Sequence, residues 1–396
     1  IARALSSVEQ DQALWEERFY TALEDFKFLP AGRITAGAGT ARNVTLFNCF
    51  VMGTVPDSMG GIFDALKEAA LTMQQGGGIG YDFSTIRPRG AEVKGVAADA
   101  SGPLSFMDVW DAMCRTIMSA GSRRGAMMAT MRCDHPDVEA FIEAKKDAAR
   151  LRMFNLSVLI TDPFMDAVKA DGPWELVFGG RVYQTVQARD LWNKIMRNTY
   201  DFAEPGVIFI DRINKANNLG YCESIAATNP CGEQPLPSYG GCVLGPIILP
   251  SFVRHAFGEG RPAVFDMTGF AQAVRWQVRA LDNVLDVAAW PLVQQAQEAR
   301  QKRRIGVGFT GLGDALVMLG LRYDRPQGRK MARNIAQTMR DNAYAASVAL
   351  AKERGAYPLF DADICLTAGT FASRLPPALR AAIRKHGLRN SHLLSI

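Results

Sequence analysis

An amide, a thiol and a carboxylate stand at alternate positions of one short segment, which reads Asn229-Pro230-Cys231-Gly232-Glu233. In an extended chain the side-chain period is two, so we expect Asn229, Cys231 and Glu233 to face the same side. A sulfur that carries a radical could take a hydrogen atom from a sugar while the carboxylate removes a proton from the neighbouring hydroxyl. The amide could hold the hydroxyl groups. The segment therefore predicts radical chemistry on a sugar.

The residues around this cysteine predict a rigid loop rather than a core segment. Pro230, Gly232 and Pro235 interrupt regular structure, and loops held on a scaffold are common places for reactive groups. A cysteine in an apolar protein is otherwise usually a small buried side chain. Cys49 and Cys242 are also candidates for chemistry, and their separation in the sequence does not pair them.

Composition narrows the class of protein. The 396 residues are 48% apolar and 21% charged, as in an ordinary globular protein with a large core. The net charge of +5 suits phosphorylated ligands, but without Lys/Arg blocks it does not indicate nucleic-acid binding. No apolar run reaches ~18 residues, so we expect no membrane span. The seven cysteines are irregularly spaced, which predicts a reducing cytoplasm rather than a disulfide scaffold or a zinc site. The four histidines are scattered, so we expect no metal site.

The chain alternates between strand-like and helix-like segments, which predicts an α/β fold with a mainly parallel sheet or barrel. The strands that we expect are 46–52, 153–161, 174–178, 207–210 and 305–310. The helices that we expect are 62–73, 136–146, 163–170, 188–200, 267–287, 312–319 and 328–354. Another helix is expected near the start, where Ser6 and Glu9 match a capping box.

A Gly-x-Gly-x-x-Gly string at residues 306–311 matches the letters of a dinucleotide-binding fingerprint. That fingerprint needs an apolar strand directly before its first glycine. Here Lys302, Arg303 and Arg304 precede it, with Ile305 the only apolar residue between. We therefore interpret the string as a barrel strand that turns into a helix.

Taken together, the motifs resemble the large catalytic chain of ribonucleotide reductases, most closely the adenosylcobalamin-dependent class. Besides residues 229–236, the resemblance rests on ordered motifs at residues 28–32 (FLPAG), 47–51 (FNCFV), 76–80 (GGGIG), 123–127 (RRGAM), 133–137 (CDHPD) and 303–312 (RRIGVGFTGL). It implies reduction of ribonucleotides to deoxyribonucleotides. It also implies a ten-stranded α/β barrel, incomplete in this chain.

The resemblance assigns roles to the residues of the first segment. Cys231 would carry the thiyl radical, Glu233 would be the general base, and Asn229 would bind the ribose hydroxyls. A positioned base is typically worth ~10²–10⁴ in rate. Cys49 and Cys242 would be the reducing pair that becomes a disulfide, which an external dithiol then reduces.

Further roles follow from the same resemblance. Asn48, Cys49 and Gly78 would contact the substrate, and the lack of a Cβ at Gly78 would allow close approach. Five residues would bind nucleotide effectors, dNTP or ATP: Asp57, Ser58, Arg87, Arg123 and Arg124. Arginine suits phosphate because its planar fork donates two parallel hydrogen bonds.

The resemblance also implies an organisation and partners. We expect a helical segment over residues 1–45 and the barrel over 46–396, with a finger loop at 229–236 and the C-terminal remainder of the reductase absent. Adenosylcobalamin would be the cofactor, and a thioredoxin-like or glutaredoxin-like protein the reductant. A homodimer is compatible with it, whereas nucleic-acid and membrane partners are not expected.

Two alternatives stay open, and some positions depart from the family pattern. The chain could belong to the oxygen-dependent class, whose radical comes from a di-iron partner chain, or it could be a non-catalytic nucleotide-binding remnant. Gly32 and Ile34 stand where many relatives have Ser and Thr, and residues 245–249 (GPIIL) replace a Gly-Ser-Ile-Asn-Leu-like stretch. These departures put local hydrogen bonds to substrate in doubt.

Overall fold

The computed structural model describes residues 1–42, 44–93, 99–117, 125–258 and 260–394. The chain forms two compact units, one made of residues 1–48 with 241–396 and the other of residues 49–240. Within the described residues, no helix is both long and apolar enough to cross a membrane.

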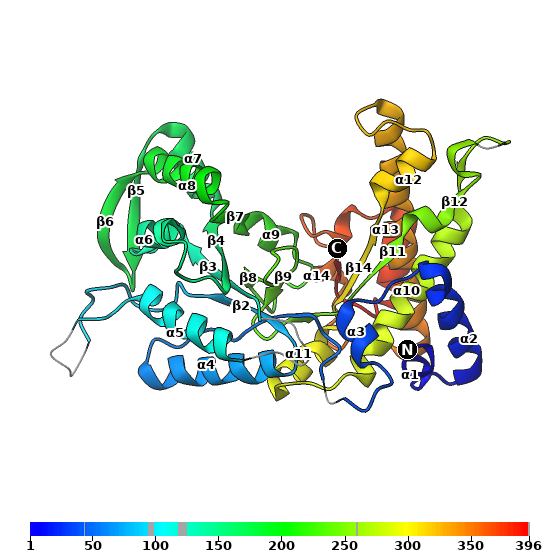
Figure 1. Cartoon of the computed structure of the whole chain (residues 1–396), viewed down its shortest axis with the longest axis horizontal. Coiled ribbons are helices and arrows are strands. Elements are labelled where there is room, and N and C mark those ends of the chain that lie inside the picture. Colours follow the sequence, from blue (N-terminus) through cyan, green and yellow to red (C-terminus); the bar gives the residue numbers. More distant parts are fainter. Residues whose placement is uncertain (43, 94–98, 118–124, 259, 395–396) are drawn as a thin grey trace. The chain divides into compact units, whose positions relative to one another are not determined.

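A parallel sheet lies at the centre of the 49–240 unit (Figure 1). Its strands pair in the order β1 (Cys49–Val51), β2 (Gly78–Asp82), β3 (Met127–Arg132), β4 (Phe154–Ile160) and β7 (Gly206–Phe209). Nearly all residues of β1, β3 and β4 are buried, as expected of parallel strands covered on both faces. The predicted α/β class with a mainly parallel sheet is confirmed.

Helices and two hairpins complete this unit. The helices are α4 (Met59–Gln74), α5 (Pro103–Thr116), α6 (Val138–Glu143), α7 (Asp162–Ala170), α8 (Ala188–Phe202) and α9 (Ile210–Ala216). The hairpins are β5 (Pro173–Phe178) with β6 (Arg181–Gln187), and β8 (Ile225–Thr228) with β9 (Pro235–Pro237). The strands and helices predicted here are all present, with ends shifted by a few residues. Strands β2, β3, β6, β8 and β9 and helices α5 and α9 were not predicted.

The other unit packs helices around a smaller parallel sheet. That sheet has the order β11 (Leu244–Ile248), β14 (Ile305–Thr310) and β15 (Leu393–Leu394). The unit also contains the short strand β10 (Gly241–Cys242) and a two-stranded antiparallel sheet of β12 (Val253–Arg254) and β13 (Val264–Phe265). The helices are α1 (Ala2–Ser6), α2 (Gln12–Leu23), α3 (Gly32–Gly37), α10 (Met267–Val287), α11 (Val293–Lys302), α12 (Leu312–Met318), α13 (Pro326–Arg354), α14 (Ala362–Cys365) and α15 (Pro377–His386).

The glycine string of this unit has the predicted structural role. Gly306 and Gly308 lie inside β14, and Gly311, with φ of +79°, begins α12. A Cβ on Gly306 would come within 3.0 Å of the Cys242 sulfur. The string is therefore a strand that turns into a helix.

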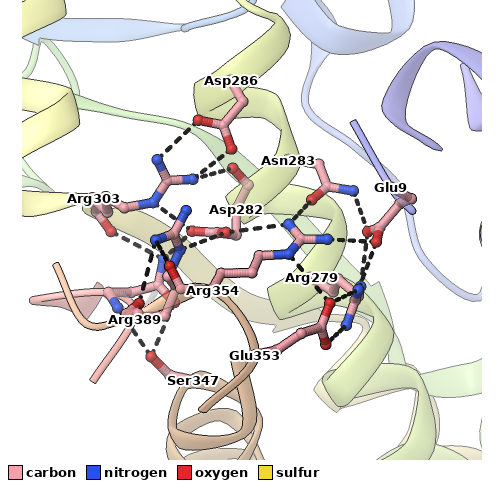
Figure 2. A network of polar contacts seen from close by, with 12 residues as sticks. Glu9, Arg279, Asp282, Asn283, Asp286, Arg303, Ser347, Glu353, Arg354 and Arg389 are labelled. Carbon is pink, nitrogen blue, oxygen red and sulfur yellow. Dashed lines mark hydrogen bonds and ion pairs between the residues drawn. The ribbon is translucent and has the colours of Figure 1, made fainter. Parts of the chain in front are cut away.

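A buried network of charged residues joins α10 and α13 to the segments at both ends of this unit (Figure 2). The Asp282 side chain is fully buried. It accepts hydrogen bonds from Arg303 Nε at 2.9 Å, Arg389 Nε at 3.2 Å and Asn390 Nδ2 at 2.8 Å. Figure 2 shows three arginines, Arg303, Arg354 and Arg389, gathered around this one carboxylate. A buried carboxylate needs such partners because removing a charge from water is costly.

Glu9 belongs to the same network, and the capping box predicted for it is wrong. Its carboxylate accepts from Arg279 Nε at 2.7 Å and Asn283 Nδ2 at 2.7 Å. Ser6 is the last residue of α1, and Asp11 caps α2 by accepting from the Leu14 amide at 3.0 Å. Tertiary ion pairs therefore use the carboxylate that the sequence pattern assigned to a helix end.

Candidate active site

The predicted reactive residues lie in the loop between β8 and β9. The loop is a tight turn, in which the Gly232 amide donates to the Asn229 carbonyl at 3.0 Å and Gly232 has φ of +85°. Asn at the first position, Pro at the second and Gly at the fourth match the preferences of a type I turn. The expectation of an extended segment with one shared face is wrong, because this turn closes the β8–β9 hairpin.

Asn229 nevertheless joins two of the predicted reactive groups. Its Nδ2 donates to Glu233 Oε1 at 2.7 Å and to the Cys49 sulfur at 3.3 Å. Its Oδ1 accepts from the Gln234 amide at 2.8 Å, so the side-chain orientation is fixed from both ends. One amide therefore ties the base candidate Glu233 to the thiol candidate Cys49.

The reactive side chains of the loop differ in solvent exposure from Asn229. Asn229 is fully buried, whereas Cys231 and Glu233 are exposed. The Cys231 thiol is therefore open to a molecule that binds at the loop, as a reactive thiol requires. The loop thus has a buried amide at its base and an open thiol and carboxylate at its surface.

Two of the predicted substrate contacts are neighbours in the sheet. Cys49 in β1 lies opposite Gly78 in β2, and both are the first residues of their strands. Gly78 is therefore the strand neighbour of Cys49, the residue whose sulfur Asn229 contacts. Asn48 belongs to the other unit, where its Oδ1 accepts from the Arg33 amide at 3.2 Å.

Cys242 also belongs to the other unit. It is fully buried, and its thiol donates to the Val243 carbonyl at 3.6 Å. Because Cys49 lies in the 49–240 unit, the pairing of these two cysteines stays a prediction.

Three predicted effector residues line one cavity of about 360 Å³. Arg87 Nε donates to both oxygens of Asp57, at 3.1 and 2.9 Å. Ser58 caps α4 by accepting from the Gly61 amide at 3.2 Å. Apolar side chains complete the lining, including Ile62, Ile86 and Phe106. Arg123 and Arg124 lie outside the described residues.

The hairpin also involves residues that the motifs did not indicate. Asn155 in β4 donates through Nδ2 to the Pro230 carbonyl at 2.7 Å. Its signal in the sequence is a polar residue between Phe154 and Leu156 in an apolar strand.

Tyr239, after β9, donates to Glu68 at 3.0 Å. Burial, together with this carboxylate, raises the pKa of Tyr239 to about 12, so its hydroxyl stays protonated.

A second cavity, of about 380 Å³, adjoins the loop on the side of β7 and α9. Its lining is mainly apolar, with one guanidinium, and comprises Val207, Ile208, Phe209, Arg212, Ile213, Ala216, Thr228, Gly232 and Pro235. Arg212 also lies over the Phe209 ring, 5.6 Å from its centroid. Gly232 places this cavity next to Cys231 in the chain.

Comparison with known proteins places the chain in a family. Residues 47–396 match the family model described as "Ribonucleotide reductase, barrel domain". A vitamin B12-dependent ribonucleoside-diphosphate reductase of Mycobacterium tuberculosis is 38% identical over 349 residues, covering 87% of this chain and 49% of the relative.

Two further relatives extend the comparison. A relative with the same name, from Thermoplasma acidophilum, is 36% identical over 344 residues, covering 86% of this chain and 44% of the relative. A ribonucleoside-diphosphate reductase subunit alpha of Chlamydia muridarum is 28% identical over 455 residues, covering 100% of this chain and 42% of the relative. The chain thus spans about half the length of the curated relatives that it matches. The family model covers most of the chain, and the chain therefore belongs to the ribonucleotide reductase family.

Proposed function

We propose that this protein reduces ribonucleotides to 2′-deoxyribonucleotides by thiyl-radical chemistry, with adenosylcobalamin as its radical source. The observation that carries the proposal is the Asn229 amide, which holds Glu233 and Cys49 together in the loop that exposes Cys231. The names of the relatives from M. tuberculosis and T. acidophilum support the choice of cofactor. The substrates would be ribonucleoside di- or triphosphates.

Each residue of the loop has a chemical task in this proposal. The Cys231 sulfur, as a thiyl radical, takes the hydrogen atom from C3′ of the ribose. Glu233 removes the proton of the 3′-hydroxyl, and general-base catalysis of this kind is typically worth ~10²–10⁴ in rate. Asn229 orients the Glu233 carboxylate and, through the same amide, the Cys49 thiol.

The reduction itself needs two electrons and two protons from thiols. Cys49 protonates the 2′-hydroxyl, which leaves as water, and the second thiol hydrogen is delivered to C2′. Cys49 and Cys242 together supply the two electrons and become a disulfide. Cys231 returns the hydrogen atom to C3′. A thioredoxin-like or glutaredoxin-like dithiol would then reduce the disulfide by exchange.

The residues beside the loop would contact one part of a large organic cofactor with polar substituents. Phe209 and Ile213 offer apolar surface, and Arg212 offers a fork of donors for amide or phosphate oxygens. When bound, adenosylcobalamin would supply the radical that takes the hydrogen atom from the Cys231 thiol. The protein would supply position and electrostatics.

The cavity around Asp57, Ser58 and Arg87 supports an effector site for dNTP or ATP. Ile62 and Phe106 offer apolar walls for a base, and Arg87 and Asp57 are hydrogen-bonded to each other in the same lining. Arg123 and Arg124 stay part of this proposal. A cytoplasmic location would suit a protein whose cysteines must be re-reduced.

The test uses the full-length protein with adenosylcobalamin as the only radical source, a dithiol and ribonucleoside diphosphates or triphosphates. We expect deoxyribonucleotide without added iron or a second chain, and no product from Cys231→Ser, which should still bind nucleotide. Product that appears only with a radical-bearing partner chain would assign the oxygen-dependent class. Nucleotide binding with no product in any arm would indicate a non-catalytic remnant.

A further inference from the structure

The β8–β9 hairpin is seated on the parallel sheet of its own unit by contacts from successive strands. A Cβ on Gly80 in β2 would lie 1.8 Å from the Thr228 carbonyl oxygen, so only glycine lets β8 approach so closely. The Thr130 hydroxyl in β3 donates to the Ala226 carbonyl at 2.9 Å. These contacts fix the strand that leads into the loop, but they end before Cys231.

One side chain reaches the loop itself from the next strand. Asn155 in β4 donates through Nδ2 to the Pro230 carbonyl oxygen at 2.7 Å. The residues on either side, Phe154 and Leu156, are buried, whereas Asn155 is exposed on the face that carries the loop. Its donor is therefore directed at the loop and not at the core.

The acceptor is the carbonyl that belongs to the Pro230–Cys231 peptide bond. Because a peptide group is planar, a hydrogen bond to this oxygen also restrains the nitrogen and Cα of Cys231. The Gly232 amide, bonded to Asn229, restrains the chain on the other side of the cysteine. The sulfur is thus carried by a backbone segment that is held on both sides.

We propose that Asn155 is a positioning residue for Cys231, which holds the peptide before the radical cysteine at the distance its chemistry needs. The inference rests on the proposed function for its kinetic consequence, but the restraint on the loop stands on the geometry alone. Displacements of about 1 Å can cost ~10²-fold in rate when reacting atoms must be aligned. Asn155 touches neither substrate nor cofactor in this account.

The test compares Asn155→Asp with Asn155→Gln in the full-length protein. Aspartate has nearly the same shape but places acceptors opposite the carbonyl oxygen, whereas glutamine keeps a donor. We expect Asn155→Asp to lower kcat about 10- to 100-fold, with KM changed less than about twofold, and Asn155→Gln to recover part of the loss. Ser157→Ala is the matched control, because Ser157 lies two residues along the same face of β4, where it pairs with Gly206 of β7.

A second readout needs no turnover. Alkylation of Cys231 by iodoacetamide can be followed by mass spectrometry without cofactor. It should be at least about threefold faster in Asn155→Asp than in the wild type, because the loss of one hydrogen bond lets the loop open more often. Cys222 is exposed too and serves as the internal reference, with an unchanged rate. Wild-type kcat and labelling in Asn155→Asp would overturn the proposal, as would an equal loss of kcat in Ser157→Ala. If the wild type makes no product, the proposed function fails and labelling alone decides the restraint.

Discussion

The two units use the same residue types, Asn with Asp or Glu, in opposite ways. In the helical network of Figure 2, the Glu9 and Asp282 side chains are fully buried and each is bound by more than one arginine. In the loop between β8 and β9, Glu233 is exposed and is bound by a neutral amide, that of Asn229. A carboxylate surrounded by guanidinium groups serves the fold. One that is held by an amide and open to water can accept a proton from a bound molecule.

The largest effect is expected at the exposed carboxylate. Glu233→Gln keeps the shape of the side chain and its contact with Asn229 but removes the base, so kcat should fall by ~10²–10⁴. The urea midpoint should be nearly unchanged, because exposed substitutions usually alter stability by no more than about 0.5 kcal/mol. Glu175→Gln, at an exposed glutamate of β5, is the control and should leave kcat unaltered. A fully active Glu233→Gln enzyme would show that the exposed carboxylate is not the catalytic base.

The buried network should show the reverse pattern, with a loss of stability. Asp282→Ala leaves Arg303, Arg389 and Asn390 without their common acceptor, and breaking a buried pair typically costs roughly 3–5 kcal/mol. Asp286→Ala removes a side chain that is 35% exposed and forms an ion pair with Arg303, and should cost less than about 1 kcal/mol. Urea midpoints of both variants measure the difference. Equal midpoints would show that the buried carboxylate has no special role.

A smaller, pH-dependent effect is expected at Glu9. Burial opposes ionisation of Glu9, but hydrogen bonds from Arg279, Asn283 and Arg354 lower its pKa below 4.5, the value expected of an ordinary glutamate. The folded state therefore binds its proton less readily than the unfolded chain, and the stabilisation is present above pH 4.5 and lost as the pH falls through the folded pKa.

The measurement is the difference in urea midpoint between the wild type and Glu9→Gln at several pH values. We expect the wild type to be more stable at pH 7, with an advantage that shrinks below about pH 4.5. An advantage that stays constant or grows in acid would show that Glu9 is not held ionised by the network.

The sequence predicted helices and strands well where apolar residues recur with the period of a helix or a strand. Helix α10 and strand β14 lie at the predicted residues, because each combines a regular apolar pattern with clear ends. Strand β2 was missed because Gly78 and Gly80 have low strand propensity. Glycine is required there by the close passage of Thr228 over Gly80, a contact between segments far apart in the sequence.

The reactive residues were predictable by type and order, but their geometry was not. The alternate spacing of Asn229, Cys231 and Glu233 predicted an extended strand, whereas Pro230 and Gly232 form a turn. The link from Asn229 to Cys49 spans 180 residues and follows from the tertiary fold alone. Likewise, the restraint from Asn155 depends on β4 lying beneath the loop.

The central claim is that the Cys231 sulfur takes a hydrogen atom from C3′ of the substrate. A hydrogen on sulfur exchanges with water, so a ribonucleotide carrying tritium at C3′ should lose some of it to the solvent during turnover. The direct measurement is this release by the full-length protein with adenosylcobalamin and a dithiol, compared between the wild type and Cys231→Ser. The account predicts release by the wild type and none above background by the variant, while both bind nucleotide equally. Release by Cys231→Ser at the wild-type rate would contradict it.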